Sequence, residues 1–375
     1  MDAAPDTRQL IARLTPLATL LATIDAQVQP VVARDVELSA AAGRILAADA
    51  AAPRQPDVVL ALQDGWALAA DATLGAGGHS PALLPTVPQR VEVGQVMPPG
   101  TDCVAPFDAV KLSGSRAEVL STINPGDGVL PAGGDCDSGV ALRRAGEPLR
   151  AIDNAVFAAA GVARVAVREP HICVLPLRTN SISDAAARLV AGDAERRGGL
   201  VRLDGRRDLA AATAADGADA IVAIGGTGQG HDDASVQTLA RVGRVVTHGI
   251  ALTPGETAAF GFAGPKPVLL LPGRLDAALS VWLLVGRRML DRLVARDNDN
   301  KEGEPAETLP LTRKVASTVG LAELVPVRRN AGRAEPLATK YLSLSSLARS
   351  DGWILVPADS EGYSAGSPVQ VRPWP

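Results

Sequence analysis

The segment of this sequence best suited to binding an anion is a glycine-rich turn between Ala220 and Asp233. The apolar run AIVAI ends there, and Thr227 stands among four closely spaced glycines: Gly225, Gly226, Gly228 and Gly230. Because glycines carry no side chain, backbone N–H groups can approach a phosphate, and the N-terminus of a following helix adds to the attraction. Asp232 and Asp233 come next, and carboxylates can hold Mg²⁺. The spacing is not that of a Rossmann fingerprint or a P-loop, and a plain strand-to-helix turn capped by Asp233 is the structural alternative.

A second apolar run, which starts at Val268, also ends in residues that could bind an anion. Pro272 and Gly273 terminate it, and the guanidinium of Arg274 could pair there with a phosphate or oxyanion. A βα turn with a solvated arginine is the alternative. Arg178 follows a third apolar run, ICVLPL. Since ligands of doubly wound sheets lie beyond the carboxyl ends of the strands, we expect these turns at one edge of a sheet.

Acidic residues in glycine-rich turns form a further group of candidates. Asp64 lies in LALQDGWAL, and Asp135 and Asp137 lie in VLPAGGDCDSG. Aspartates that only shape a turn are the alternative for each of them. The four histidines are scattered and show no spacing typical of a metal site or a nucleophilic triad.

Composition limits the kind of protein that can carry these residues. The chain has 375 residues, of which 47% are hydrophobic and 21% charged, and a net charge of −4. This indicates a globular protein of about two or three domains with no basic field for nucleic acid. The three cysteines have no CxxC spacing and favour a reducing cytosol. No signal peptide is evident, and the apolar stretch 277–285 is too short to span a membrane, so we expect a cytoplasmic protein.

The first half of the chain is predicted to hold two domains. Leucines at three- and four-residue spacing predict helix over 7–50, with a short strand that leads into a helix ending at Pro53. A helix followed by a strand is predicted over 151–167. We therefore assign 1–56 and 147–169 to a helical linking domain. Glycine and proline become frequent over 57–146, with short strand-like runs between them, which predicts an inserted β-rich module.

The second half is predicted to be an α/β domain followed by a β domain. Strands alternate with helices over 170–300, which favours a parallel, doubly wound sheet. The polar, acidic stretch 297–308 is predicted to be a linker. Residues 309–375 are β-like again.

Taken in order, nine stretches resemble one family, the molybdopterin molybdenumtransferases, whose eukaryotic branch is the gephyrin E domain. The family's "MDGYA" resembles QDGWA at 63–67, its "GG.S.G..D" resembles part of 218–233, and its "LPGNP" resembles LPGRL at 271–275. The other six similar stretches are 41–53, 98–104, 133–139, 157–174, 253–261 and 346–371.

The sequence departs from the family pattern where the family binds anions. Thr253 and Glu256 stand in place of the two lysines of "KPGKP", and Val93 stands in place of a threonine. The family's "TGDEL" is absent after the first strand of the α/β domain. A glutamate in place of a lysine turns attraction of an anion into repulsion. Arg178 and Arg274 are the nearby basic residues that could substitute.

The resemblance implies a multi-domain fold of class α/β plus β: a doubly wound molybdopterin-binding α/β domain, a Gly/Pro-rich β module, a helical linking segment and a C-terminal β domain. It implies a transferase of molybdenum cofactor biosynthesis that binds adenylated molybdopterin and inserts molybdate with release of AMP. The alternative is a catalytically degenerate carrier or scaffold for molybdopterin or the finished cofactor, which the lost lysines favour.

The resemblance also implies roles for particular residues. Catalytic roles fall to Asp64, Asp135, Asp204 and Asp233, and an Mg²⁺ ion would lie at Asp233 and Asp204. The pterin ligand would contact Gly225, Gly226, Thr227, Pro272, Gly273, Arg274 and Arg178. Expected partners are the pterin, a second copy of the chain in a homodimer and a client molybdoenzyme, with neither nucleic acid nor membrane.

Overall fold

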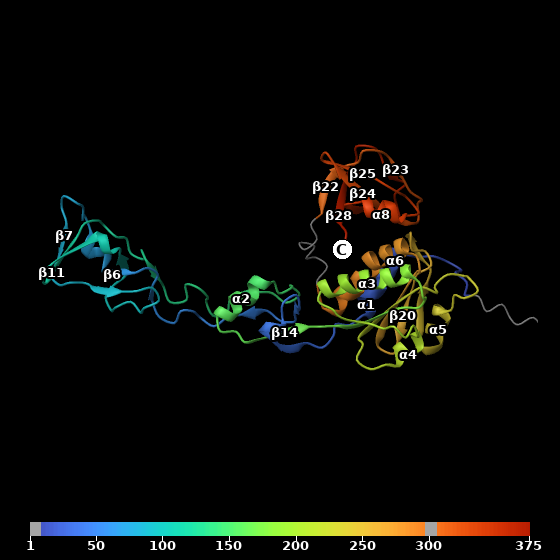
Figure 1. Ribbon diagram of the computed structural model, residues 1–375, viewed down its shortest axis with the longest axis horizontal. Coiled ribbons are helices and arrows are strands. Elements are labelled where there is room, and N and C mark those ends of the chain that lie inside the picture. The colour runs from blue at the N-terminus through green and yellow to red at the C-terminus, as the bar shows by residue number, and fades with distance from the viewer. Residues whose placement is uncertain (1–8, 297–305) are drawn as a thin grey trace, which may run out of the picture.

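The computed structural model describes residues 9–296 and 306–375, which form an elongated molecule (Figure 1). An α/β domain lies at one end with the C-terminal β domain beside it. A β-rich module built from residues 57–146 lies at the opposite end, and a linking region that contains α2 and β14 lies between them. The expected multi-domain architecture of class α/β plus β is confirmed.

Six strands form the sheet of the α/β domain. Four are parallel, in the order β16 (Leu200–Leu203), β15 (His171–Pro176), β17 (Ala220–Ile224) and β21 (Lys266–Leu271). The sheet continues with two antiparallel strands, β20 (Ala259–Ala263) and β18 (Arg244–His248). The expectation of a parallel sheet is therefore wrong at this edge. Only two residues join β20 to β21, which suits a hairpin and is too short for a parallel crossover.

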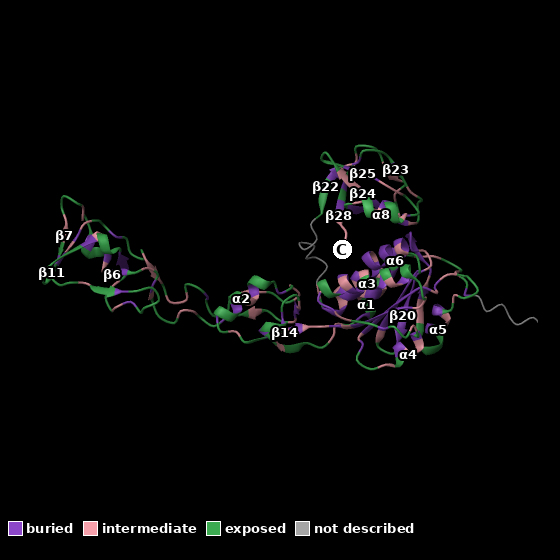
Figure 2. Ribbon diagram, viewed as in Figure 1, coloured by how far each residue is buried: buried purple, intermediate pink, exposed green. Residues whose placement is uncertain are grey.

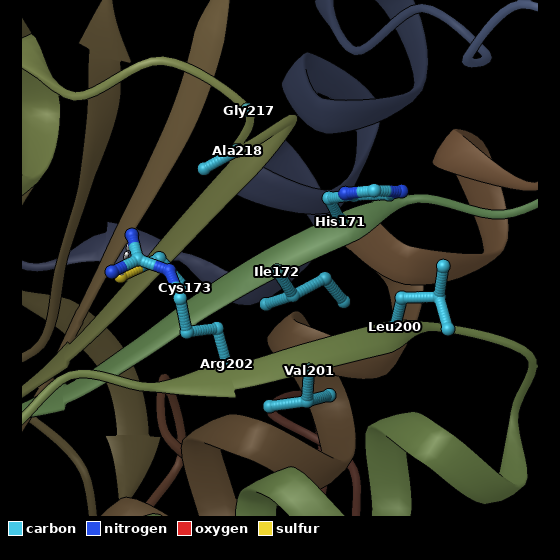
Figure 3. A pocket seen from close by; sticks show the side chains of 8 residues that line it. All are labelled: His171, Ile172, Cys173, Leu200, Val201, Arg202, Gly217 and Ala218. Atoms are coloured by element: carbon cyan, nitrogen blue, oxygen red, sulfur yellow. Dashed lines mark hydrogen bonds between the residues drawn. The ribbon is translucent and has the colours of Figure 1, made fainter.

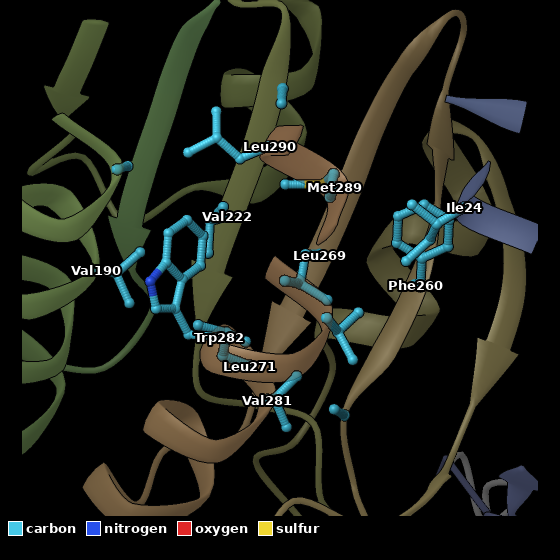
Figure 4. Close-up of a cluster of buried hydrophobic side chains, with 14 of the residues drawn as sticks. Ile24, Val190, Val222, Phe260, Leu269, Leu271, Val281, Trp282, Met289 and Leu290 are labelled. Carbon is cyan, nitrogen blue, oxygen red and sulfur yellow. The ribbon is translucent and has the colours of Figure 1, made fainter. Parts of the chain in front are cut away.

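Helices cover both faces of this sheet. One face carries α1 (Leu17–Gln27), α3 (Ser181–Arg196), α6 (Leu275–Val281), the π-helical turn η4 (Trp282–Gly286) and α7 (Arg287–Leu293). Figure 4 shows this core, with Trp282, Phe260 and Leu269 packed between sheet and helices. The other face carries α4 (Leu209–Ala214) and α5 (Ser235–Val242). Burial on both faces explains why β17 and β21 are continuous apolar runs.

The N-terminal segment is mostly not helical. Only α1 forms within 7–50, and it packs on the α/β core, whereas strands and a 3₁₀ turn follow: β2 (Arg34–Glu37), η1 (Leu38–Ala40), β3 (Ile45–Leu46) and β4 (Ala50–Ala51). The predicted long helix is wrong because Pro30 lacks the N–H that a helix needs. Val31 and Val32 beside it are β-branched and favour extended backbone.

The linking region and the β-rich module consist of small sheets. In the linking region, β2 and β3 flank β14 (Arg164–Arg168), next to α2 (Ala151–Ala159), and this helix followed by a strand confirms the prediction for 151–167. The module has two three-stranded sheets, β8-β6-β9 and β10-β11-β7. Their strands are β6 (Gly65–Leu68), β7 (Ala82–Leu84), β8 (Gln89–Val91), β9 (Cys103–Ala105), β10 (Val110–Ser113) and β11 (Arg116–Val119). Shorter elements complete it: β5 (Leu60–Ala61), β12 (Val129–Leu130), β13 (Ala141–Arg143), η2 (Ala70–Thr73) and η3 (Phe107–Ala109).

Burial is uneven along the molecule. Figure 2 shows dense burial in the α/β domain and much more exposed surface over the module. The module has only small apolar clusters, around Cys103 and around Val104. It therefore has a thin core, as its glycine and proline content suggests.

The C-terminal domain shares a sheet with a strand that continues from the α/β domain. The extended segment that starts at Arg244 divides at Gly249, whose φ is +95°, into β18 and β19 (Ile250–Thr253). β19 pairs in parallel with β1 (Thr15–Pro16) on one side and with β24 (Ala322–Asn330) on the other. The rest of the domain comprises β22 (Glu307–Pro310), β23 (Val315–Ala316), β25 (Arg333–Pro336), α8 (Leu344–Arg349), β26 (Gly352–Val356), β27 (Gly362–Tyr363) and β28 (Pro368–Pro373).

The linker is predicted over 297–308. Most of it, residues 297–305, lies outside the described residues. β22 begins at Glu307, so a strand occupies the end of that segment. Among the described residues, no helix has the length and apolar character needed to cross a membrane.

A buried ion pair fixes the helices that lie over the sheet. The Asp193 carboxylate accepts from Nε and Nη2 of Arg287 at 2.8 and 2.9 Å, and from Nε1 of Trp282 at 2.7 Å. Burial is the largest single effect and would raise the pKa of Asp193, but the hydrogen bonds from Arg287 and Trp282 and the charges of Arg287 and Arg197 together outweigh it and hold the pKa below its ordinary value. This carboxylate therefore joins α3 to the π-helical turn and to α7.

We expect Asp193→Ala to lower the free energy of unfolding of the α/β domain by about 3–5 kcal/mol, because it leaves the Arg287 charge buried without its partner. Urea denaturation followed by far-ultraviolet circular dichroism measures this loss. Arg196→Ala is the matched control, because Arg196 lies 3.5 Å from Asp193 but is mostly exposed. It should cost less than about 1 kcal/mol.

The same pair should make the domain acid-sensitive. Because the folded pKa of Asp193 is lowered, its contribution is complete above the unfolded value of about 3.9 and is lost as the pH falls through the folded value. Equal stability of wild type and Asp193→Ala at neutral pH would contradict this role.

Candidate functional site

The two glycine-rich strand ends predicted from the sequence lie side by side. β17 and β21 are neighbours with Ile224 opposite Leu271, and the N–H of Gly225 donates to the carbonyl of Leu271 at 2.8 Å. A side chain added at Gly273 would meet the Cα of Gly225 at 3.6 Å. Gly225 and Gly226 have φ values of +100° and +72°, which favour glycine. The edge of the sheet is therefore lined by bare backbone, as anion binding requires.

Arg178 lies over this bare edge. It follows β15, and its Nη2 donates to the carbonyl of Asp232 at 2.7 Å and to Oδ1 of Asp233 at 3.0 Å. A Cβ at Gly225 would lie 3.2 Å from Cγ of Arg178. The structure thus brings Arg178, Asp233 and the glycine turn together, and it places a cation where an anionic ligand would arrive.

Asp233 closes the glycine turn and does not cap the next helix. Its Oδ2 accepts from the N–H of Gly230 at 3.0 Å, and a side chain added at Gly228 would lie 2.6 Å from that oxygen. Helix α5 begins at Ser235 without a side-chain cap. The alternative in which Asp233 is an ordinary helix cap is therefore wrong, and the carboxylate shapes the loop itself.

Residues from distant parts of the chain anchor the turn. Thr227 contacts the hydroxyl of Thr257 at 3.1 Å, and its carbonyl lies 3.0 Å from Nε2 of His248. Gln9 donates from Nε2 to the carbonyls of Gly226 and Gly228 at 2.7 and 2.8 Å. Sequence reasoning missed Gln9, because a lone glutamine more than 200 positions away carries no local signal.

Glu256 stands where the family has a lysine, and its carboxylate is held within its own turn. It accepts from Oγ1 of Thr253 at 2.6 Å and from the N–H of Gly255 at 3.0 Å. The two replaced positions therefore bond to each other. Together they bring a negative charge and no cation to this side of the strand ends.

Arg274 compensates for part of this charge. Its Nε donates to Oδ1 of Asp276 at 3.0 Å, and its Nη2 also contacts that carboxylate. These hydrogen bonds are the main reason that the pKa of Arg274 is raised, and the nearby charge of Glu256 adds to the effect. Pro272 is buried behind it, whereas Gly273 and the Arg274 side chain are exposed. Arg274 therefore stands at the rim as predicted, with its charge largely balanced.

Asp204 is bound by arginines. The carboxylate is buried and accepts from the side chain and N–H of Arg206, at 2.7 and 2.9 Å, and from Arg202 at 3.2 Å. The hydrogen bond from Arg206 holds the pKa of Asp204 far below its usual range. Asp204 lies at the carboxyl end of β16, and the contacts that it makes are with its own loop.

Asp64 and Asp135 lie outside the α/β domain. Asp64 accepts from the N–H of Val93 at 2.8 Å within the β-rich module, and the N–H of Asp135 donates to the carbonyl of Gln55 at 3.0 Å. Figure 1 shows the module, with β6, at the end of the molecule opposite the glycine turns. The structure does not bring these two acids to Asp233 within one chain.

The predicted Mg²⁺ site does not fit the donor set of a single chain. In the described parts of the chain, no group of three or more His, Cys, Asp or Glu side chains could share a metal ion. Asp233 and Asp204 are each engaged by arginine. The prediction of a site at these two residues is thus not supported by the arrangement of one chain.

A small cavity lies at the other edge of the same sheet. It has a volume of about 210 Å³ and opens near the beginnings of β15 and β16. Figure 3 shows Arg202 beside Cys173, with His171 and Leu200 at the starts of their strands. None of the predicted ligand-binding residues lines this cavity.

Comparison with known families assigns the chain. Residues 15–161 match the MoeA N-terminal region (domain I and II). Residues 174–292 match a domain described as a probable molybdopterin binding domain, and 308–374 match the MoeA C-terminal region (domain IV). The chain belongs to the MoeA family, which confirms the resemblance found in the sequence.

Individual relatives agree with this assignment. A molybdopterin biosynthesis protein of Methanocaldococcus jannaschii is 26% identical, with 90% of this chain and 91% of that protein covered. Molybdopterin molybdenumtransferase 1 of Mycobacterium tuberculosis is 27% identical over 80% of this chain and 77% of its own length. The crystal structure of the MoeA protein of Pyrococcus horikoshii matches with a TM-score of 0.77 at 24% identity, over 97% of this chain and 100% of that one, which shows the shared fold.

Proposed function

We propose that this protein is a molybdopterin molybdenumtransferase of molybdenum cofactor biosynthesis, which binds adenylated molybdopterin and inserts molybdate with release of AMP. Relatives in Mycobacterium tuberculosis and Haemophilus influenzae bear the name of this enzyme. The observation that carries the proposal is the pair of bare strand ends, at Gly225–Gly226 and Gly273, inside the molybdopterin binding domain. Backbone N–H groups there can approach the phosphate of the pterin or its adenylate.

Arginines take over the role of the missing lysines in this proposal. Arg178 and Arg274 stand at the ends of β15 and β21, on either side of the glycine turn. A developing negative charge on the departing AMP phosphate can be stabilised by such fixed cations. Because Asp233 holds Arg178 and Asp276 holds Arg274, both guanidinium groups are oriented before the ligand arrives.

The acids of the β-rich module are proposed to act across a homodimer. In one chain, Asp64 lies far from the glycine turns (Figure 1), so it can contribute only to the site of a second copy. The N–H of Val93 donates to Asp64, and Val93 is one of several exposed apolar residues in this part of the module, with Val59, Leu62 and Val96. Such a surface suits contact with another protein. In this arrangement, Asp64 and Asp135 of one copy would face the α/β domain of the other.

Three further expectations remain proposals. Magnesium has no supporting donor set in one chain, and we derive no catalytic step from it. Cytoplasmic location is supported by three free, buried cysteines, which a reducing compartment would preserve. Delivery of the product to a client molybdoenzyme follows from the chemistry, since the finished cofactor must reach an apoenzyme.

We expect Gly273→Val to weaken molybdopterin binding about tenfold or more without unfolding the protein, because the new side chain would project into the gap between the strand ends. The added Cβ meets only the Cα of Gly225, at an ordinary contact distance of 3.6 Å. Gly226→Val is a poorer test, since φ at Gly226 is +72° and a side chain there strains the backbone. Equilibrium titration with molybdopterin measures the effect.

Gly205→Val is the matched control. Gly205 lies just after β16, and a side chain added there meets nothing within 4 Å. It should bind molybdopterin as the wild type does. Equal binding by Gly273→Val would place the site elsewhere.

We expect Arg274→Ala to lower the rate of AMP release from adenylated molybdopterin, in the presence of molybdate, by about 10²-fold, because it removes a preorganised cation. Arg349→Ala, which changes an exposed arginine of α8, should leave the rate unchanged. An unchanged rate in Arg274→Ala would contradict the compensation. A wild type that binds molybdopterin but releases no AMP would instead establish the carrier alternative.

Light scattering at micromolar concentration should give twice the mass of the chain. Val93→Lys should shift the protein toward monomer, because a charge would be buried at an apolar contact. Leu112→Lys, at an exposed leucine of β10, is the control and should remain dimeric. A monomeric wild type would exclude the shared site.

A further inference from the structure

Tyr341 of the C-terminal domain is presented at the rim of the candidate site. It is the most exposed of the chain's ten aromatic side chains, with 61% of its surface accessible. The guanidinium carbon of Arg274 lies 4.8 Å from the centroid of its ring. An aromatic residue and an arginine from two different domains therefore form one stacked unit, which we call the stacking platform.

Two buried carboxylates hold the stacking platform. Asp276 is 3% exposed and accepts from Arg274 and, at 3.1 Å, from the N–H of Leu342, the residue after Tyr341. Glu323 is 2% exposed and accepts from the N–H of Lys340, the residue before Tyr341, at 2.7 Å. One buried acid on each side thus fixes the turn that exposes Tyr341.

This arrangement is unusual for a residue that only covers a surface. Burying a carboxylate is costly unless its hydrogen bonds are satisfied, and here both acids bond to the backbone beside Tyr341. Lys340 also adopts a φ of +62°, which is uncommon for a non-glycine residue. The structure therefore places an aromatic ring in water with considerable precision.

The stacking platform adjoins the bare strand ends. Arg274 directly follows Gly273, which faces Gly225. The Arg274 side chain is 57% exposed, so its stack with Tyr341 is open to solvent. A ligand whose phosphate reaches the glycine turns would place its remaining part near this rim.

We infer that the stacking platform binds the planar nitrogen heterocycle of the ligand, so that Tyr341 is a specificity-determining residue supplied by the C-terminal domain. The inference rests on the proposed function. Two rings of the adenylated substrate share this chemistry, the pterin and the adenine. Both are flat and polarisable, and both can stack on the face of Tyr341 that Arg274 leaves open.

The surrounding charges favour a ring at this place over a second phosphate. Asp276 neutralises Arg274, and Glu256 adds a negative charge nearby. A second anionic group against the ring of Tyr341 would gain little there, whereas stacking needs no net charge. The phosphate at the strand ends is left to the glycine turns, Arg178 and Arg274, and the C-terminal domain selects for the ring.

The test compares Tyr341→Leu, which removes the aromatic face, with Tyr341→Phe, which keeps it. The full chain is titrated separately with molybdopterin, AMP and inorganic phosphate. Tyr341→Leu should weaken binding of one ring-bearing probe about 10- to 100-fold, as loss of an aromatic stacking partner does. Tyr341→Phe should bind nearly as the wild type does, and phosphate should bind all three proteins equally.

Each outcome has a defined meaning. A loss confined to molybdopterin assigns the pterin ring to the stacking platform, and a loss confined to AMP assigns the adenine. Wild-type affinity of Tyr341→Leu for both probes overturns the inference while the proposed function stands. An equal loss of phosphate binding also overturns it, because Tyr341 would then act on the anion site. A wild type that binds neither ring-bearing probe refutes the proposed function and the inference together.

Asp276→Asn tests the positioning of the stacking platform. The amide weakens the bond to Arg274 but can still accept from Leu342 N–H. Affinity for the ring-bearing probe should fall in this variant, and adding Tyr341→Leu should lower it little further, because the two changes disable one unit. Fully additive losses would contradict a shared platform.

Discussion

The site depends on the close approach of two parallel strands that both end in glycine. β17 and β21 are paired up to Ile224 and Leu271, and a Cβ added at Gly273 would lie 3.6 Å from the Cα of Gly225. Because Gly225, Gly226 and Gly273 have no side chains, bare backbone lines this edge of the sheet. The side chains at this edge are Thr227 and Arg274, which directly follow the glycines, and Arg178 and Gln9, which come from other parts of the chain.

In the proposed site, arginines stand in for the lysines that the sequence lacks. The lysine positions, Thr253 and Glu256, have become a self-bonded turn, and the cations now stand at the ends of β15 and β21. Each arginine has its own aspartate, Asp233 for Arg178 and Asp276 for Arg274. The pairs keep the guanidinium groups oriented and limit their net charge. The site is therefore built to orient an anionic ligand more than to attract it by a strong positive potential.

The elongated shape gives the domains separate tasks. The α/β domain carries the dense core and the glycine turns, and β19 carries its chain directly into the sheet of the C-terminal domain. This shared sheet lets Asp276 reach Leu342 and holds Tyr341 next to Arg274. The β-rich module has a thin core and lies far away, so its acids can serve a ligand site only in an assembly of two chains.

The sequence by itself determined the family, the strands β15, β17 and β21 and the two glycine turns, because fully buried strands are apolar on both faces and backbone-lined turns must be glycine. It misassigned 7–50 as helix, since leucine spacing was weighed above Pro30. It also missed β20, because only a turn, and no helix, separates the apolar run of β20 from β19. Tertiary structure alone decided which charges meet. Arg206 binds Asp204, Gln9 holds a turn more than 200 residues away, and two buried acids present Tyr341, because contacts between residues distant in sequence leave no local pattern that could be read in advance.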